Sequence, residues 1–154
     1  MDGTLDEIDA AMLDVHWAVD TRSVILLVQA YARLRAGLPP RTPGGRVMMM
    51  TSGQDSAGGM PDEIAYSLQK GALASVTRSL ATSLSDLAVT VNTVNPGPVD
   101  TGYMSGEAYE NIAALFPAGR WGMPDDPARL LAWLATDEAE WITGQVINSE
   151  GGIR

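Results

Sequence analysis

The order of the apolar segments constrains the fold more than any other feature of the sequence. Short apolar runs that suit buried strands alternate with longer segments in which apolar residues recur every three or four positions. Strands and helices that alternate in this way form parallel sheets covered by helices. We therefore predict one α/β domain over residues 1–154, with about three parallel strands flanked by helices. The predicted strands are 47–50, 89–94 and 145–148, and the predicted helices are 5–34, 61–84, 127–135 and a short one near 107–115.

Composition narrows the possible partners. A chain of 154 residues has the length of one domain, and a net charge of −9 argues against nucleic acid or an anionic membrane surface as the main partner. No apolar run approaches the roughly 20 residues of a membrane span, and the acidic start resembles no targeting peptide. The chain has no cysteine, which excludes thiolate metal sites and fits a reducing cytoplasm. We assign no metal-binding residue.

The helix predicted for 61–84 carries two residues that could take part in catalysis together. Lys70 is the only lysine of the chain and follows Tyr66 by four residues, a spacing that places both side chains on one helical face. An ammonium near a phenol favours the phenolate and suits acid–base work near neutral pH. Both residues lie off the apolar stripe that we predict to be buried, which consists of Ile64, Leu68, Ala72, Val76, Leu80 and Leu84. A solvated pair with no chemistry is the simpler alternative.

Candidate residues also follow the predicted strands. Ser52 comes directly after the first strand, Pro96-Gly97 after the second and Glu150-Gly151 after the third. Sites of parallel α/β sheets lie at the carboxyl ends of the strands. The topology thus predicts a site where these three segments meet.

Three sequence blocks resemble the short-chain dehydrogenase/reductase family. They are Ser52 with Tyr66-x-x-x-Lys70, then the run from Val91 to Thr101, then Ile142 to Gly152, and they occur in the family's order. The resemblance implies an oxidoreductase that interconverts carbonyls and alcohols. Ser52 would orient the substrate oxygen, Tyr66 would exchange the proton, and Lys70 would favour the phenolate and hold the nicotinamide ribose.

The same resemblance implies a cofactor and a substrate region. NAD or NADP is the implied cofactor, and its nicotinamide would lie against Tyr66, Lys70, Pro96, Gly97, Val99 and Thr101. The segment from Tyr103 to Trp121 would cover the substrate. Tyr103, Met104 and Phe116 of that segment would favour a partly apolar small carbonyl or alcohol, although Tyr103 and Phe116 could instead be core residues.

Two positions depart from the family pattern. Asp20 stands where the family usually has an asparagine that anchors a water in the proton relay, so we include Asp20 among the catalytic candidates. The segment between Ser52 and Tyr66 is about one residue longer than usual, which makes Ser56 a second candidate hydroxyl. We prefer Ser52.

The cofactor-binding half of the family is missing from this sequence. Family members begin with a Gly-rich turn that holds the cofactor pyrophosphate at a helix N-terminus, and no segment matches it. At about 30 residues per βαβ unit, the missing half amounts to roughly 90 residues. The resemblance therefore implies a truncated, Rossmann-like fold, a catalytic half whose affinity for NAD or NADP is weak unless a second polypeptide completes it.

The missing half also leaves the strand 47–50 at the edge of the sheet, apolar and without protective charges. We expect a homo-oligomer, or a partner chain that covers this edge, and not a stable monomer.

Two other functions stay open beside the oxidoreductase. One is a non-redox enzyme, such as a dehydratase, isomerase or cyclase, that reuses Tyr66 and Lys70. The other is a catalytically inactive interaction module.

Overall fold

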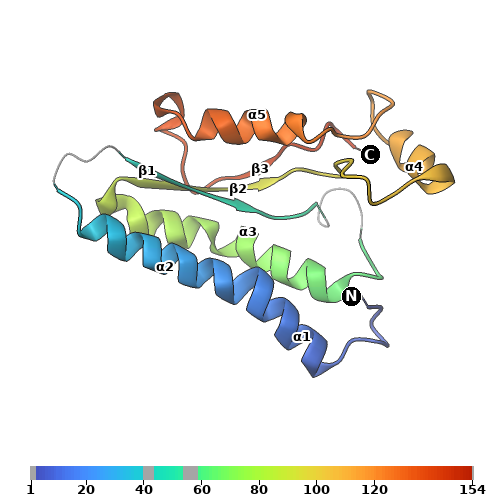
Figure 1. Ribbon diagram of the computed structural model, residues 1–154, viewed down its shortest axis with the longest axis horizontal. Coiled ribbons are helices and arrows are strands. Elements are labelled where there is room, and N and C mark those ends of the chain that lie inside the picture. Colours follow the sequence, from blue (N-terminus) through green and yellow to red (C-terminus); the bar gives the residue numbers. More distant parts are fainter. Residues whose placement is uncertain (1–2, 40–43, 54–58, 154) are drawn as a thin grey trace.

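The sheet is parallel and has its strands in sequence order. The computed structural model describes residues 3–39, 44–53 and 59–153. Within them, β1 (Gly45–Met50) pairs with β2 (Val89–Asn95), and β2 pairs with β3 (Val146–Asn148), all in parallel (Figure 1). The short β3 reaches only the last part of β2, from Thr93 to Asn95. The predicted fold, a truncated Rossmann-like sheet of three parallel strands, is confirmed.

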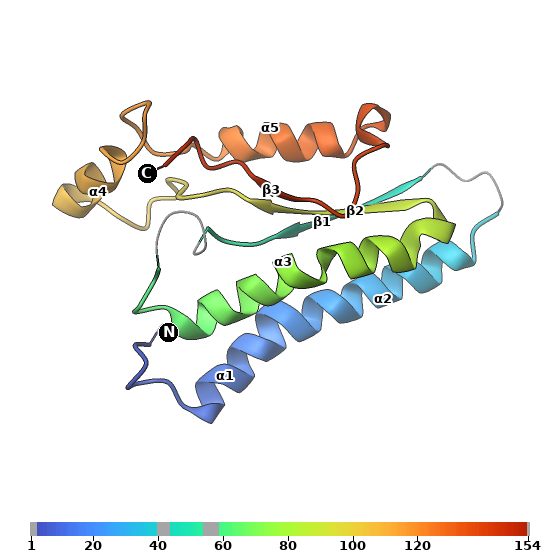
Figure 2. The same ribbon diagram turned by 180° about the vertical axis from the view of Figure 1, so that it is seen from behind.

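Helices cover both faces of the sheet. The helices α1 (Ala10–His16), α2 (Ser23–Ala36) and α3 (Ile64–Leu84) lie on one face, and α5 (Asp125–Leu134) lies on the other (Figures 1 and 2). The helix α4 (Gly106–Ala113) lies at the end of the sheet where β2 and β3 finish. Single turns of 3-10 helix occupy Ser85–Leu87 and Asp137–Ala139. No helix of the described ranges has the length and apolar character that crossing a bilayer requires.

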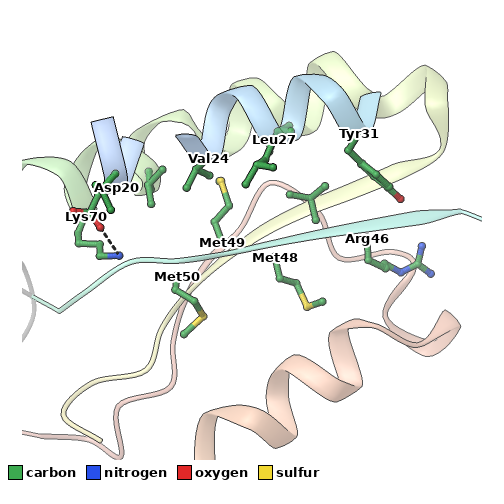
Figure 3. Close-up of a pocket in the computed structure, with 13 residues that line it drawn as sticks. Asp20, Val24, Leu27, Tyr31, Arg46, Met48, Met49, Met50 and Lys70 are labelled. Atoms are coloured by element: carbon green, nitrogen blue, oxygen red, sulfur yellow. Dashed lines mark ion pairs between the residues drawn. The ribbon is translucent and has the colours of Figure 1, made fainter. Parts of the chain in front are cut away.

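The alternating side chains of β1 divide the core into two parts. Met49 points toward α2 and packs with Val28, Leu73 and Val91 (Figure 3). Met48 and Met50 point to the opposite face, where they pack against the cluster around Leu134 of α5 (Figure 3). This alternation follows from the two-residue period of a strand. It also explains why an uninterrupted apolar run is needed at this strand.

The first helical segment differs from the prediction at its beginning. The helix does not start at Leu5 but at Ala10, because the side chain of Asp9 accepts a hydrogen bond from the backbone N–H of Met12 (2.8 Å) and caps the helix. A π-helix, Trp17–Arg22, connects α1 to α2 without a break in the helical path. The other predicted elements begin and end within about three residues of the observed ones, the uncertainty usual for element boundaries.

The buried face of α3 corrects the predicted stripe. Leu68 is 59% exposed, although the stripe placed it inside. Val76 and Leu80 do pack against the core, so the stripe holds only in the C-terminal half of the helix. The fully buried positions are Ala65, Gln69, Leu73, Thr77, Ala81 and Leu84. Two of them, Gln69 and Thr77, are polar, so a pattern of apolar residues does not predict their burial.

Hydrogen bonds explain these two buried polar residues. Gln69 accepts a hydrogen bond from the hydroxyl of Thr21 (2.8 Å). The hydroxyl of Thr77 shares a hydrogen bond with that of Thr93 on β2 (2.6 Å) and donates to the carbonyl of Leu73 (2.8 Å). Buried polar groups are tolerated when they are paired in this way. The contacts tie α3 to the π-helix on one side and to the central strand on the other.

The outer edge of β1 has no neighbouring strand among the described residues, as predicted. Large apolar side chains are also exposed on the helices beside it. Val19 and Leu27 are 64% and 69% exposed and line a groove together with residues of β1. This surface is the one that an additional strand or chain would cover.

Candidate active site

A cavity of about 690 Å³ lies at the carboxyl ends of the strands. Six of the predicted site residues line it: Ser52, Tyr66, Gly97, Val99, Tyr103 and Met104. They come from the segment after β1, from α3 and from the segment after β2, so residues distant in sequence converge as the topology predicts. The volume is within the range of small-molecule sites.

Lys70 approaches the back of the Tyr66 ring. Its Nζ lies 5.5 Å from the ring centroid, which is within the range of a cation–π contact. The carbonyl of Lys70 accepts a hydrogen bond from the hydroxyl of Thr51 (2.7 Å). Thr51 directly follows β1, and its N–H donates to the carbonyl of Val94 (2.9 Å). The end of the sheet therefore fixes the turn of α3 that carries Lys70, beside Ser52.

Asp20 forms an ion pair with Lys70. The distance from Lys70 Nζ to Asp20 Oδ1 is 3.5 Å, and both side chains are about one-fifth exposed (Figure 3). Asp20 belongs to the π-helix, and π-helical turns are frequent at functional sites. Asp20 and Lys70 also line a groove of about 500 Å³ between α2 and β1. Asp20 thus contacts Lys70 of the candidate pair directly, and its catalytic role stays a prediction.

The segments after β2 and β3 hold each other in place. Asn95 donates hydrogen bonds to the side chains of Glu150 (2.7 Å) and Asn148 (3.2 Å) and accepts one from the N–H of Gly97 (2.9 Å). Gly97 has φ = +65°, and a Cβ there would lie 2.6 Å from the Cβ of Glu150. The close approach requires glycine and leaves Gly97 and Val99 on the wall of the cavity.

Replacing Gly97 with alanine should destabilise the chain by more than the about 1–3 kcal/mol of a left-handed backbone alone, because the methyl group also meets Glu150. Gly102 provides the matched control, with φ = +82° and no atom within 4 Å of a Cβ. Gly102→Ala should therefore show only the backbone effect. Urea unfolding of both variants measures the difference, and equal losses would contradict the packing role of Gly97.

The predicted lid segment is held by aromatic contacts. Trp121 is 1% exposed, stacks on Tyr109 with 5.0 Å between the ring centroids, and meets the edge of Tyr103 at 5.8 Å. Trp121 Nε1 donates to the carbonyl of Tyr109 (2.8 Å). Partial desolvation, then the charges of Glu63 and Asp100 and the phenol of Tyr66, raise the pKa of Tyr103 above its ordinary value. Tyr103 therefore faces the cavity as a neutral hydroxyl.

Several predicted residues lie elsewhere. Phe116 is 5% exposed and lines a second cavity, of about 430 Å³, together with Pro96 and Glu150. Thr101 is exposed and is not among the residues that line the 690 Å³ cavity. Ser56 lies outside the described residues. The structure thus does not bring Phe116, Pro96 or Thr101 to the cavity of Tyr66.

The sequence reasoning missed two charged or titratable residues. Glu63 lines the cavity, as does the predicted Glu150, and His16 contacts Asp20 with 3.3 Å between Nδ1 and Oδ2. The position of Glu63 depends on the path of the segment that precedes α3, which no local pattern reveals. His16 could have been found, because it precedes Asp20 by four residues, the spacing that singled out Tyr66 and Lys70.

The residues at the cavity fit the nicotinamide end of a dinucleotide. Gly97 and Val99 form a wall with little side-chain bulk, and Tyr66 and Ser52 stand at the same cavity. The residues that would hold that end are Tyr66, Gly97 and Val99, with Lys70 behind the phenol. A planar ring and a small carbonyl can be held together in a space of this size.

Comparisons with known proteins indicate the family of this chain. A family profile described as Enoyl-(Acyl carrier protein) reductase matches residues 1–154. The uncharacterized oxidoreductase YjdA of Bacillus subtilis is 50% identical over 146 residues, which are 95% of this chain and 57% of that protein. A Serratia marcescens short-chain dehydrogenase/reductase mutant superimposes with a TM-score of 0.86 at 32% identity, covering 99% of this chain and 60% of that one.

A third relative was solved with a cofactor. The angucycline C-6 ketoreductase LanV with bound NADP has a TM-score of 0.84 and 31% identity, covering 98% of this chain and 57% of that one. The chain spans less than two thirds of the length of each of these relatives. The profile and these relatives nevertheless match nearly the whole chain. The chain belongs to the short-chain dehydrogenase/reductase family.

Proposed function

We propose that this chain carries the catalytic half of an NAD(P)-dependent oxidoreductase that interconverts a small, partly apolar carbonyl compound and its alcohol. The observation that carries the proposal is the placement of Ser52 and Tyr66 at one cavity, with the Lys70 ammonium 5.5 Å from the centre of the phenol ring. A proton donor backed by a cation is what carbonyl reduction needs on the oxygen side of the substrate.

The chain's own groups act on the substrate oxygen. The hydroxyl of Ser52 donates a hydrogen bond to this oxygen and orients it. The hydroxyl of Tyr66 donates the proton, and the Lys70 ammonium stabilises the phenolate that remains. A bound nicotinamide would supply the hydride. Tyr103, Met104 and Leu115 line the same cavity and favour a substrate with an apolar portion.

Affinity for the cofactor is the weak part of the site. The residues present contact only the nicotinamide end, while the pyrophosphate contacts of the family belong to the half that the sequence lacks. We infer that the chain alone binds NADH or NADPH with a Kd above about 100 µM, equivalent to less than roughly 5.5 kcal/mol of binding free energy. A second polypeptide that supplies the missing half would tighten it.

Titration with NADH and NADPH, followed by nicotinamide fluorescence and then by carbonyl-dependent oxidation, tests this function. The expected result is weak binding with turnover at millimolar cofactor. Saturation at or below about 100 µM would contradict the incomplete cofactor site. Substrate turnover without nicotinamide would support the non-redox alternative. If the chain showed no cofactor binding and no turnover, the oxidoreductase proposal would be overturned and an inactive interaction module would be favoured.

We also infer that the chain associates with itself or with a partner chain. The free edge of β1 and the exposed Val19 and Leu27, which line the groove beside it, form an apolar surface that monomers rarely leave open. Helix pairing through α2 and α3 would bury part of it. Sedimentation velocity at micromolar concentration should report a dimer or larger species, and a compact monomer would contradict this inference.

The lack of cysteine suits a reducing cytoplasm as the location of the chain.

A further inference from the structure

Two cavities lie next to each other at the carboxyl ends of the strands. One has a volume of about 690 Å³ and contains the candidate proton donor Tyr66. The other has a volume of about 430 Å³ and is lined by Phe116 and by the segment that follows β3. Among the described residues, Pro98 and Glu150 are the two that line both cavities. These two residues therefore form the wall between them.

The lid segment is divided in the same way. Leu115 lines the larger cavity, whereas the next residue, Phe116, lines the smaller one. A Cβ on Gly151 would lie 3.2 Å from Cδ1 of Phe116, so the ring packs on the backbone directly after Glu150. Phe116 is 5% exposed, which makes its ring a fixed part of the smaller cavity. The two cavities are thus separate compartments, and an opening between them has to pass the wall of Pro98 and Glu150.

The side chain of Glu150 is fixed at both of its ends. Asn95 is 1% exposed, and its Nδ2 donates a hydrogen bond to Oε2 of Glu150 (2.7 Å). The same amide donates to Asn148 (3.2 Å) and accepts the N–H of Gly97 (2.9 Å), so it cannot turn away. A hydrogen bond to a carboxylate is also stronger than one between neutral groups. At the other end, a Cβ on Gly97 would lie 2.8 Å from the Cα of Glu150, so the two backbones are in contact.

The other residue of the wall, Pro98, is held by its backbone. Its ring fixes φ, and its carbonyl accepts a hydrogen bond from the N–H of Gly122 (3.2 Å). The next residue, Val99, forms a parallel β-bridge with Gly122. Glu150 differs because it enters the wall with a flexible type of side chain, whose removal leaves the backbone in place. Glu150 is therefore the residue at which the wall can be opened.

We propose that Glu150 limits the length of the substrate, because its side chain separates the two cavities. This inference rests on the proposed function. The reacting carbonyl lies at the hydroxyl of Tyr66, and the remainder of the substrate extends along the larger cavity until it meets Glu150. Without this side chain, the smaller cavity continues the larger one and takes up a longer apolar tail. Its apolar lining includes Pro96, Phe116 and Ala118. Glu150 acts on the far end of the substrate and takes no part in proton transfer.

Straight-chain methyl ketones of increasing length test this limit. In the wild-type chain, kcat/KM should rise by up to about fourfold for each methylene that is buried, and level off where the tail reaches Glu150. Glu150→Ala should move this plateau to longer ketones and raise their kcat/KM by at least about tenfold, the effect of two further buried methylenes. A plateau at the same chain length in both proteins would overturn the proposal.

Two further variants separate the bulk of Glu150 from its charge and from its role in folding. Glu150→Gln keeps the length of the side chain and can still accept the hydrogen bond from Asn95, so the wild-type plateau should remain. If Glu150→Gln moved the plateau as far as Glu150→Ala does, charge and not bulk would set the limit, and the proposal would be wrong. Glu150→Asp shortens the side chain by one methylene and should give an intermediate plateau. It replaces Glu150→Ala as the test if the alanine variant does not fold by circular dichroism.

Binding without turnover separates this inference from the proposed function. Saturation-transfer nuclear magnetic resonance gives the Kd of the same ketones for each variant in the absence of nicotinamide. A chain-length limit that moves in Glu150→Ala would support the wall even if no ketone were reduced, a result that would refute the proposed function alone. Reduction of short ketones with one limit in all variants would overturn the role of Glu150 and leave the proposed function intact.

Discussion

Replacing Tyr66 with phenylalanine is expected to lower kcat for carbonyl reduction by about 10²- to 10⁴-fold, the range for loss of a positioned proton donor. The variant keeps the ring that faces Lys70 and loses only the hydroxyl at the cavity. KM should change little, because the substrate contacts of the cavity remain. The rate is measured from the decrease of NADH or NADPH absorbance at millimolar cofactor with a series of small ketones.

Tyr103→Phe is the matched control for this experiment. Tyr103 lines the same cavity and loses the same hydroxyl in the variant, but Lys70 is not placed behind it. The control should affect KM and leave kcat within a few-fold of the wild-type value. If Tyr66→Phe retained full kcat while Tyr103→Phe lost it, the proton donor would be Tyr103 and the assignment of Tyr66 would be wrong.

Replacing Leu73 with alanine is expected to destabilise the chain by about 2–5 kcal/mol, the range for truncating a buried leucine. Leu73 is 2% exposed and packs from α3 against α2 and the sheet, in the cluster of Val28, Met49 and Val91. The truncation leaves a cavity that these neighbours cannot fill. Urea unfolding followed by circular dichroism at fixed chain concentration measures the loss.

Leu68→Ala is the matched control, since it makes the same change five residues away on the same helix. Leu68 is 59% exposed, so its truncation should alter the free energy of unfolding by no more than about 0.5 kcal/mol. A larger destabilisation from Leu68→Ala than from Leu73→Ala would support the burial of Leu68 that the sequence predicts. It would also place Leu68 in an interface between chains if the loss depended on chain concentration.

Most of the fold could be predicted from the sequence because its strands are marked by local patterns. The run 47–50 is uninterrupted and apolar, and the turn at Asn95-Pro96-Gly97 ends the next strand. The buried face of α3 could not be predicted from apolar residues alone. Gln69 and Thr77 are buried because Thr21 and Thr93 satisfy their hydrogen bonds, and both partners are remote in sequence.

The candidate site was predictable where topology fixes it and not where loops do. Ser52 and Gly97 follow neighbouring parallel strands, so the sheet brings them together, and α3 adds Tyr66. Phe116 was assigned to the substrate by its position in the lid segment, yet its ring is buried and lines the neighbouring cavity. The path of the chain between Asp100 and Gly122 decides such cases, and no short-range pattern encodes it.

The hydrogen bond from Thr51 to the carbonyl of Lys70 would link the proposed assembly to the proposed chemistry. Thr51 continues directly from the edge strand β1, so a chain that paired with this edge would stiffen the backbone that holds the lysine. Catalytic output would then depend on dilution. The rate per mole of chain would fall as the protein is diluted below the dissociation constant of the dimer, and the total rate would follow the square of concentration in that range. In an activity assay, the expected sign of this dependence is an upward curve in the plot of rate against protein concentration.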